Sequence, residues 1–197
     1  MPAKTITDAQ LNVVLAHVAD HSSDPLRDYV ILMLSFRAGL RVSEIAGLRW
    51  ADVCDAEGNL RRDILEVPKA ISKYCSGRTI PMHKAVHAAL KAYLSHLQDK
   101  RSVAMNETII HSLYGEQRKM SGNALQRYIG RLFQAVGYSG CSSHSGRRTF
   151  ITKAMRKAPQ AGCSIRDVQK LAGHRYMSTT ELYVDPSEEQ QALVDMI

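Results

Sequence analysis

The chain has 197 residues, of which 45% are hydrophobic and 23% are charged. These are ordinary values for a globular protein, and a chain of this length can bury a core without disulfides or a structural metal. No apolar run approaches the roughly 18 residues that a membrane-spanning helix needs, which excludes an integral membrane protein. The first ten residues are mostly polar and include Asp8, so no secretion signal is expected there.

The charge balance favours a polyanionic partner. Lys and Arg number 26 against 19 Asp and Glu, a net charge of +7, and such a surplus most often indicates nucleic acid, although many basic proteins never bind it. The cysteines lie far apart, so neither zinc-ribbon spacing nor a disulfide framework is expected. Free thiols fit a reducing compartment, and we expect a cytoplasmic location. The cysteines are Cys54, Cys75, Cys141 and Cys163.

The first forty-odd residues predict three helices. A Thr-x-x-Gln capping box at Thr7 is followed by apolar residues at helical spacing. Asp24 and Pro25 have the residue types of an N-cap and a first helical position, and the apolar segment that follows ends at Gly39. A third, short helix is expected to begin near Ser43.

The hydrophobic period then changes and later returns to helical spacing. Residues 64–68 and 78–81 have the composition of short strands, and the polar stretch 72–77 joins them as a hairpin tip. The sequence therefore predicts a mainly α (α+β) fold, eight or nine helices around one small antiparallel sheet, in one domain covering residues 1–197. A further helix is expected over 86–97, and capping residues predict later helices at Ser121, Ser143, Ser164, Ser178 and Ser187.

Two arginine motifs are candidates for a functional site. Arg41 stands at a break between two helices with Glu44 three residues later, within reach across one turn. His144 and Arg147 share one face at the start of a helix, where free backbone N–H groups can bind an anion. Each motif has a simpler interpretation, a surface ion pair for the first and a solvated basic helix end for the second.

Three further residues have equally simple alternatives. His174 follows Gly173 at the end of a helix and can be a C-cap that interacts with the helix dipole. Tyr183, nine residues later, can be a core residue, since tyrosine at helical spacing usually is. Lys73 lies at the hairpin tip and, taken alone, is an exposed lysine.

Their order and spacing together resemble the tyrosine recombinases, the family of phage lambda integrase, Cre and the Xer resolvases. The phrases that carry the resemblance are Gly-Leu-Arg-x-Ser-Glu-Ile-x-x-Leu from Gly39, His-x-x-Arg from His144, Leu-x-Gly-His ending at His174, and Thr-x-x-Tyr ending at Tyr183. The resemblance extends from about Thr7 to the C-terminus. It implies a catalytic domain with the fold of the DNA breaking and rejoining enzymes.

The resemblance also implies a role for each residue. Tyr183 would attack the scissile phosphate and form a 3′-phosphotyrosine link, while Lys73 would protonate the leaving 5′-oxygen. Arg41 and Arg147 would hold the non-bridging oxygens, a task that suits planar guanidinium groups because they offer paired hydrogen bonds to the charge that develops there.

The remaining implied roles are supporting ones. His144 and His174 would assist proton transfer and contact the phosphate, and Glu44 would orient its neighbours. Because a covalent tyrosine link keeps the energy of the broken bond, rejoining needs no ATP or metal. We therefore expect no cofactor and no metal, and the sequence has no P-loop or metal-ligand motif.

The sequence departs from the family pattern in three respects. Gly146 replaces the leucine of His-x-Leu-Arg and is expected to loosen the helix start by about 1 kcal/mol relative to alanine. Arg148 stands where relatives often have His or Lys. The N-terminal core-binding domain that most relatives carry is expected to be absent, a layout that resembles the fimbrial invertases, although a fragment would look the same.

The expected partner is double-stranded DNA at a specific site, with no membrane. A homotetramer on DNA is expected, while monomeric state in the absence of DNA and accessory DNA-bending proteins are left open. The tail 186–197 carries Leu193, Val194 and Ile197 and packs either on a neighbouring protomer or on its own core. The alternatives are DNA relaxation of the type IB topoisomerase kind and a non-catalytic DNA-binding regulator; a metal hydrolase is poorly supported, because the histidines lack paired spacing.

Overall fold

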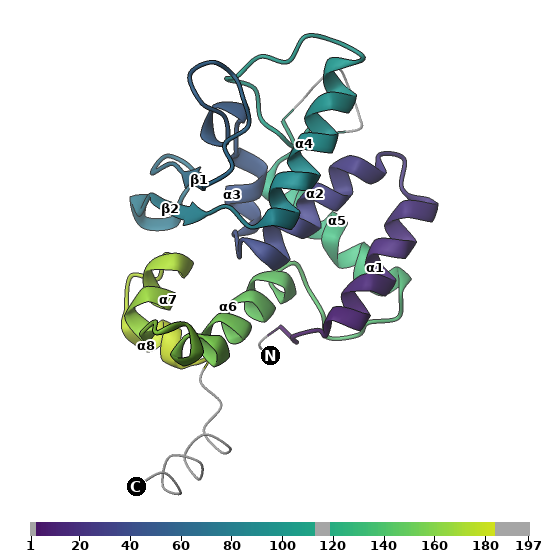
Figure 1. The fold of residues 1–197 in the computed structure, drawn as a ribbon. Coiled ribbons are helices and arrows are strands. Elements are labelled where there is room, and N and C mark those ends of the chain that lie inside the picture. Colours follow the sequence, from purple (N-terminus) through teal and green to yellow (C-terminus); the bar gives the residue numbers. More distant parts are fainter. Residues whose placement is uncertain (1–2, 113–118, 184–197) are drawn as a thin grey trace, which may run out of the picture.

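A computed structural model describes residues 3–112 and 119–183. Within them the chain folds as eight α-helices and a two-stranded antiparallel sheet, which confirms the predicted mainly α class (Figure 1). The elements are α1 (Asp8–His21), α2 (Pro25–Arg37), α3 (Val42–Gly47), β1 (Ile64–Val67), β2 (Arg78–Pro81), α4 (Lys84–Gln98), α5 (Gly122–Ala135), α6 (Ser145–Lys157), α7 (Ile165–Ala172) and α8 (Met177–Glu181). No helix in this part of the chain is long and apolar enough to cross a membrane.

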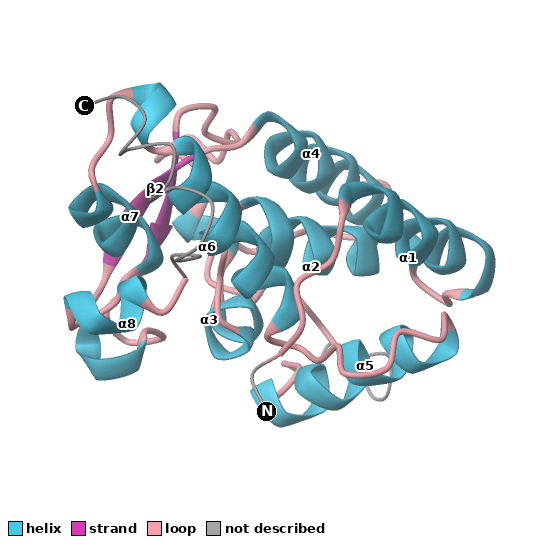
Figure 2. Cartoon of the chain, turned by 90° about the horizontal axis from the view of Figure 1, so that it is seen from below, coloured by secondary structure: helices cyan, strands magenta, loops and turns pink. Residues whose placement is uncertain are grey.

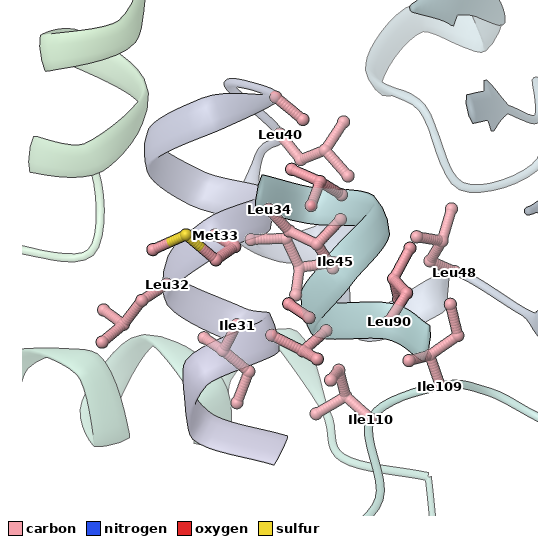
Figure 3. Packing of buried hydrophobic residues seen from close by; sticks show 14 of the residues in the cluster. Ile31, Leu32, Met33, Leu34, Leu40, Ile45, Leu48, Leu90, Ile109 and Ile110 are labelled. Carbon is pink, nitrogen blue, oxygen red and sulfur yellow. The ribbon is translucent and has the colours of Figure 1, made fainter. Parts of the chain in front are cut away.

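Helix α2 is the centre of the fold. Residues 30–34 are all buried, so this helix is apolar on every side and must be covered by others. It packs against α1, α4 and α6, and Figure 3 shows its Leu34 beside Ile45 of α3, with Leu90 of α4 near Leu48 and Ile109. We call the buried apolar residues between Ile6 and Phe133, to which all of these belong, the large core.

The sheet confirms the two predicted strands. Its register pairs Leu65 with Ile80 and Val67 with Arg78. Leu65, Val67 and Ile80 are buried in the large core, as the period of two in a strand requires when one face is covered. The hairpin tip between the strands includes a short 3-10 turn over Lys73–Cys75.

A second apolar cluster lies between α6 and α7. It consists of Ile151, Ala158, Val168 and Ala172, and we call it the small cluster. Figure 2 shows α7 and α8 together at one side of the molecule, with β2 next to α7 and the longer helices α1, α4 and α5 farther away. Helix α6 joins the two parts, because one of its faces packs on α2 and another on α7.

Most predicted helix starts agree with the structure, with small shifts at two of them. Helix α6 begins after His144 and α8 begins after Tyr176, rather than at the expected serines Ser143 and Ser178. In α8 the N-cap is Tyr176, which makes no side-chain capping hydrogen bond, and Ser178 lies inside the helix. The helix expected at Ser187 and the tail 186–197 lie outside the described residues.

Gly146 has a packing role that its sequence context does not reveal. A Cβ atom at this position would overlap the hydroxyl of Ser35 and the ring of Phe36, both on α2. Glycine therefore allows α6 to lie close against α2. A glycine is expected to destabilise the start of the helix, but the close packing of α6 on α2, which a larger residue would prevent, offsets this cost.

Candidate active site

A buried carboxylate organises the arginines. Arg41 is the N-cap of α3, and its backbone N–H donates to Glu44 Oε2 at 2.8 Å while its Nη1 donates to Oε1 at 3.0 Å. Arg78 of β2 donates to the same two oxygens, from Nη1 at 2.8 Å and from Nη2 at 3.0 Å. Glu44 is 0% exposed, so this is not the surface ion pair of the simpler interpretation.

The charge of Glu44 is held by these partners. Burial raises the pKa of its carboxyl, but the hydrogen bonds and positive charges of Arg78 and Arg41 outweigh burial, and the net pKa is lowered. A buried carboxylate without such partners would instead take up a proton. Glu44 is therefore an anion that fixes two guanidinium groups at set angles.

Three arginines meet at the end of α7. The last carbonyls of a helix have no partner within the helix and need donors from elsewhere. Here three consecutive carbonyls each accept a hydrogen bond from a different guanidinium group, and the donors come from β2, α6 and the start of α3. Leu171 O accepts from Arg78 Nε at 3.0 Å, Ala172 O from Arg147 Nη2 at 2.7 Å, and Gly173 O from Arg41 Nη2 at 3.0 Å.

Arg147 joins the end of α7 to the loop that follows α2. Its other terminal nitrogen, Nη1, donates to Gly39 O at 2.6 Å, and the residue is 6% exposed. Burial, followed by the positive charge of Arg41, lowers the pKa of Arg147 to about 9, which still leaves it a cation at neutral pH. Clustered cations in a partly buried site repel one another, and a bound anion relieves that repulsion.

His174 follows the end of α7. Gly173 closes the helix in the left-handed conformation, at φ +63°, and turns the chain so that His174 Nδ1 lies 3.0 Å from Thr180 Oγ1. Burial and the charges of Arg147, Arg41 and Arg78 lower the pKa of His174 to about 4. The imidazole is therefore neutral at pH 7, which removes the charge on which the simpler interpretation, interaction with the helix dipole, depends.

Tyr183 lies beside His174 at the mouth of a cavity. The two rings stack with centroids 5.9 Å apart, and the guanidinium carbon of Arg148 lies 5.4 Å from the centre of the tyrosine ring. The cavity has a volume of about 390 Å³. It is lined by Ala3, Gly140, Ser142, His144, Arg147, Arg148 and Tyr183. Tyr183 is half-buried and packs against the small cluster, not in the large core.

The predicted residues fall into two groups and one outlier. His144, Arg147 and Tyr183 line the cavity, whereas the Arg41 side chain contacts Glu44 and Gly173. The end of α7 connects the two groups, because Arg147 and Arg41 donate to the neighbouring carbonyls of Ala172 and Gly173, and His174, which follows, stacks on Tyr183.

Lys73 does not line this cavity. Its ammonium lies 4.9 Å from the ring centre of Tyr74, and that ring lies 5.8 Å from the guanidinium carbon of Arg175. The hairpin tip therefore reaches the segment just after His174 without bringing Lys73 among the residues around Tyr183.

Two side chains that the sequence analysis did not single out belong to this arrangement. Arg78 appeared only as part of a strand, and Thr180, which is fully buried, only as part of the Thr-x-x-Tyr phrase. A signal for Arg78 existed, because Val67, its partner in the register, faces the core and so places the arginine on the same inward face. An inward arginine needs a buried acceptor.

Comparison with known proteins assigns the family. The model of the phage integrase family matches residues 4–190, and the chain belongs to this family. It is 31% identical over 185 residues to the tyrosine recombinase XerD of Pseudomonas aeruginosa, covering 91% of this chain and 56% of that protein. It is 28% identical over 172 residues to the tyrosine recombinase XerC of Corynebacterium efficiens, covering 87% of this chain and 50% of that protein.

The fold is also that of solved family members. The integrase of the Tn1549 transposon, solved in complex with circular intermediate DNA, superposes with a TM-score of 0.75 at 20% identity, covering all of this chain and 67% of that one. At that identity the likeness establishes the fold. The chain spans about half the length of the relatives it matches.

Proposed function

We propose that this chain cleaves and rejoins DNA at a specific site through a covalent 3′-phosphotyrosine formed by Tyr183. The observation that carries the proposal is the meeting of Tyr183, Arg147 and His144 around one cavity, in which Arg147 is held in place by its hydrogen bonds to Ala172 O and Gly39 O. A nucleophile beside preorganised cations is the arrangement that phosphoryl transfer to a protein side chain needs.

The reaction proceeds in two balanced steps. The Tyr183 hydroxyl gives up its proton to His174 or to water as its oxygen attacks the scissile phosphorus, the bond from phosphorus to the 5′-oxygen breaks, and that oxygen takes a proton and leaves as a 5′-hydroxyl. Rejoining is the reverse, with a 5′-hydroxyl attacking the phosphotyrosine and Tyr183 regaining its proton. The bond count is equal on both sides, so the sequence of steps needs no ATP.

The arginines stabilise the charge that develops on the phosphate oxygens. Because Glu44 and the carbonyls of α7 already hold the guanidinium groups in place, little reorganisation is needed when the phosphate binds. His174, neutral at pH 7, can donate a hydrogen bond to a phosphate oxygen or accept a proton, and Thr180 fixes which way its ring faces. His144, exposed at the edge of the cavity, can contact the same phosphate.

Lys73 is the proposed proton donor to the 5′-oxygen. It would have to move from its place over Tyr74 into the cavity when DNA binds. A flexible ammonium at the tip of a two-stranded hairpin is suited to such a movement, and a donor that arrives with the substrate protects against reaction with water in its absence.

DNA as the partner is supported by the net charge of +7 and by the complexes in which relatives were solved, such as the Tn1549 integrase with its circular intermediate DNA.

Exchange of strands between two sites would require a tetramer, in which four copies supply one Tyr183 each. A cytoplasmic location is part of the proposal, because the bacterial and archaeal relatives act as recombinases and chromosomal DNA lies in the cytoplasm of such cells.

Covalent trapping tests the proposal. The wild-type chain and the Tyr183→Phe variant are incubated with fragmented genomic DNA from the source of the chain, denatured in detergent, and assayed for DNA linked to protein. We expect adducts with the wild type alone, unaffected by EDTA, and sequencing of the trapped DNA would give the site. DNA binding without any adduct would contradict the proposal and favour the non-catalytic regulator.

A second measurement separates recombination from relaxation. Two duplexes that carry the trapped site and different labels are mixed with the chain, and a supercoiled plasmid with one site is treated in parallel. Recombinant products indicate strand exchange, whereas relaxation of the plasmid without exchange indicates the topoisomerase alternative. Affinity for either DNA should fall steeply as salt rises, because phosphate contacts release counterions.

A further inference from the structure

Arg78 is the one arginine of the cluster to which the family resemblance gave no role. It lies at the start of β2, is 7% exposed, and uses its whole guanidinium group. Nη1 and Nη2 donate to the two oxygens of Glu44, and Nε donates to Leu171 O. A single side chain thus connects β2, α3 and the end of α7.

The contact at α7 is tight as well as hydrogen-bonded. A Cβ atom at Gly173 would lie 2.9 Å from Arg78 Nη1 and 3.1 Å from its guanidinium carbon, so the backbone of Gly173 rests directly against the arginine. Gly173 also has a φ of +63°, which a side chain disfavours. The turn that leads to His174 is therefore shaped around the Arg78 side chain.

Arg78 also lies five residues after Lys73 on the same hairpin. The hairpin touches the end of α7 at Arg78 and again at its tip, where the Tyr74 ring lies 5.8 Å from the guanidinium carbon of Arg175. The hairpin, which carries Lys73, therefore contacts the segment around His174 at two points. One is Leu171, before His174 in the sequence, and the other is Arg175, after it.

We propose that Arg78 is a positioning residue: it fixes the last turn of α7 against Glu44, which sets the position of His174, and it ties that turn to the hairpin that carries Lys73. This inference rests on the proposed function for its effect on DNA cleavage. Arg78 does not line the cavity around Tyr183, so it acts on the phosphate through His174 and Arg41 and not by direct contact.

The test compares Arg78→Met, Arg78→Lys and a matched control, Arg101→Met. Arg101 also donates to both oxygens of a glutamate, Glu107, and to a backbone carbonyl, that of Ser102, but it contacts none of the site residues. All three proteins are assayed in single turnover on a nicked duplex that contains the trapped site, with DNA affinity measured separately.

We expect Arg78→Met to slow cleavage about 100-fold, the scale of an ångström-sized displacement near the reacting groups, with DNA affinity changed by less than about threefold. Arg78→Lys keeps the positive charge near Glu44 but cannot present the planar fork to Glu44 and Leu171 at once. It should therefore restore thermal stability toward the wild-type value without restoring the rate. Arg101→Met should cleave at the wild-type rate.

Full recovery of the rate in Arg78→Lys would overturn the inference, because positive charge alone would then be sufficient. A cleavage rate of Arg78→Met equal to that of Arg101→Met would also overturn it. A readout independent of activity is hydrogen exchange at the amides of Gly173 and His174, which donate to Lys170 O and Gln169 O. These amides should exchange faster in Arg78→Met while those of α4 do not. If the wild type forms no adduct, the proposed function fails, and the exchange measurement still decides whether Arg78 holds the turn.

Discussion

In the large core, α2 is surrounded by apolar side chains, whereas the small cluster between α6 and α7 contains four buried apolar residues within the described chain. The difference extends to the candidate site. Arg41 and Glu44 belong to α3, which packs in the large core, while His174 and Tyr183 follow the two short helices that cover the small cluster. Hydrophobic burial fixes the first group, but polar contacts across the boundary must fix the second.

Those polar contacts are the hydrogen bonds from three arginines to the last carbonyls of α7. A small apolar cluster contributes little stabilisation, since each buried side chain is worth roughly 1.5–3 kcal/mol. The segment that carries Tyr183 is thus held at Gly173 by these hydrogen bonds, and beyond it by the hydrogen bond between His174 and Thr180 and by the packing of Tyr183 on the small cluster. A small number of contacts suits the movement that the proposed reaction asks of Tyr183, which approaches a phosphate and later releases it.

Removal of the carboxylate that joins the two regions should have the largest effect. We expect Glu44→Ala to lower the free energy of unfolding by about 3–5 kcal/mol, because Arg41 and Arg78 would be left with unpaired buried charge. Urea unfolding followed by circular dichroism measures this. The matched control is Glu107→Ala, which removes the partner of Arg101 at the edge of the structure and should cost about 1 kcal/mol or less. Equal losses in the two variants would contradict this account.

Matched isoleucines compare the two apolar clusters directly. Ile31 in the large core and Ile151 in the small cluster are both fully buried. Truncation of either to alanine is expected to cost about 2–5 kcal/mol where it creates a cavity, and we expect Ile31→Ala at the upper end because its surroundings are rigid. Hydrogen exchange should show protection lost throughout the molecule in Ile31→Ala, but in α6–α8 first in Ile151→Ala. Uniform loss in both would mean that the clusters unfold as one unit.

The interface between α2 and α6 can be tested with two glycines. Gly146→Ala should destabilise the chain by about 1–3 kcal/mol, because the new methyl group overlaps Ser35 and Phe36. Gly130 lies inside α5 with nothing within 4 Å of the position of a Cβ atom, so Gly130→Ala should stabilise by about 0.5–1 kcal/mol. Thermal unfolding gives both signs, and stabilisation by Gly146→Ala would show that the two helices can move apart at no cost.

A further effect is expected on the pH dependence of stability. The pKa of His174 is lowered from 6.5 to about 4 in the fold. As pH falls through this window the unfolded chain takes up a proton that the folded chain refuses, so the free energy of unfolding falls with it. The lowered pKa of Glu44 acts in the same direction at lower pH, since its stabilisation is lost as the carboxylate is protonated.

Urea unfolding at pH 7 and pH 5 measures this for the wild type and for His174→Gln. Glutamine cannot titrate, so the difference between the two pH values should be smaller in the variant than in the wild type. An identical pH dependence would mean that His174 is accessible to protons in the fold and that the boundary between the two regions is open to water.

The sequence predicted the elements whose signals are local. The capping box at Thr7, the N-cap at Asp24 and the two strands all appear in the structure, because hydrogen bonds between near neighbours and a period of two determine them. The candidate site residues could also be identified from the sequence, because the motifs typical of the family are short and continuous in the chain.

What could not be predicted depends on contacts between distant residues. Arg78 and Leu171 are 93 residues apart, and Arg147 and Gly39 are 108 apart. The same holds for Gly146, whose local effect as a glycine is unfavourable and whose benefit arises only where α6 meets α2. The position of Lys73 over Tyr74, outside the cavity, likewise depends on how the hairpin meets Arg175.

The shared carboxylate of Glu44 has a consequence for how this site can change by mutation. Arg41 and Arg78 both depend on the same two oxygens, so a substitution of Glu44 leaves two arginines without their carboxylate, and a substitution of either arginine removes one of the two partners that hold Glu44. Single changes there should be eliminated in a selection for activity, and variants should survive only as coordinated replacements. Efforts to redirect the proposed activity to new DNA sites would therefore do best to leave these three positions unchanged.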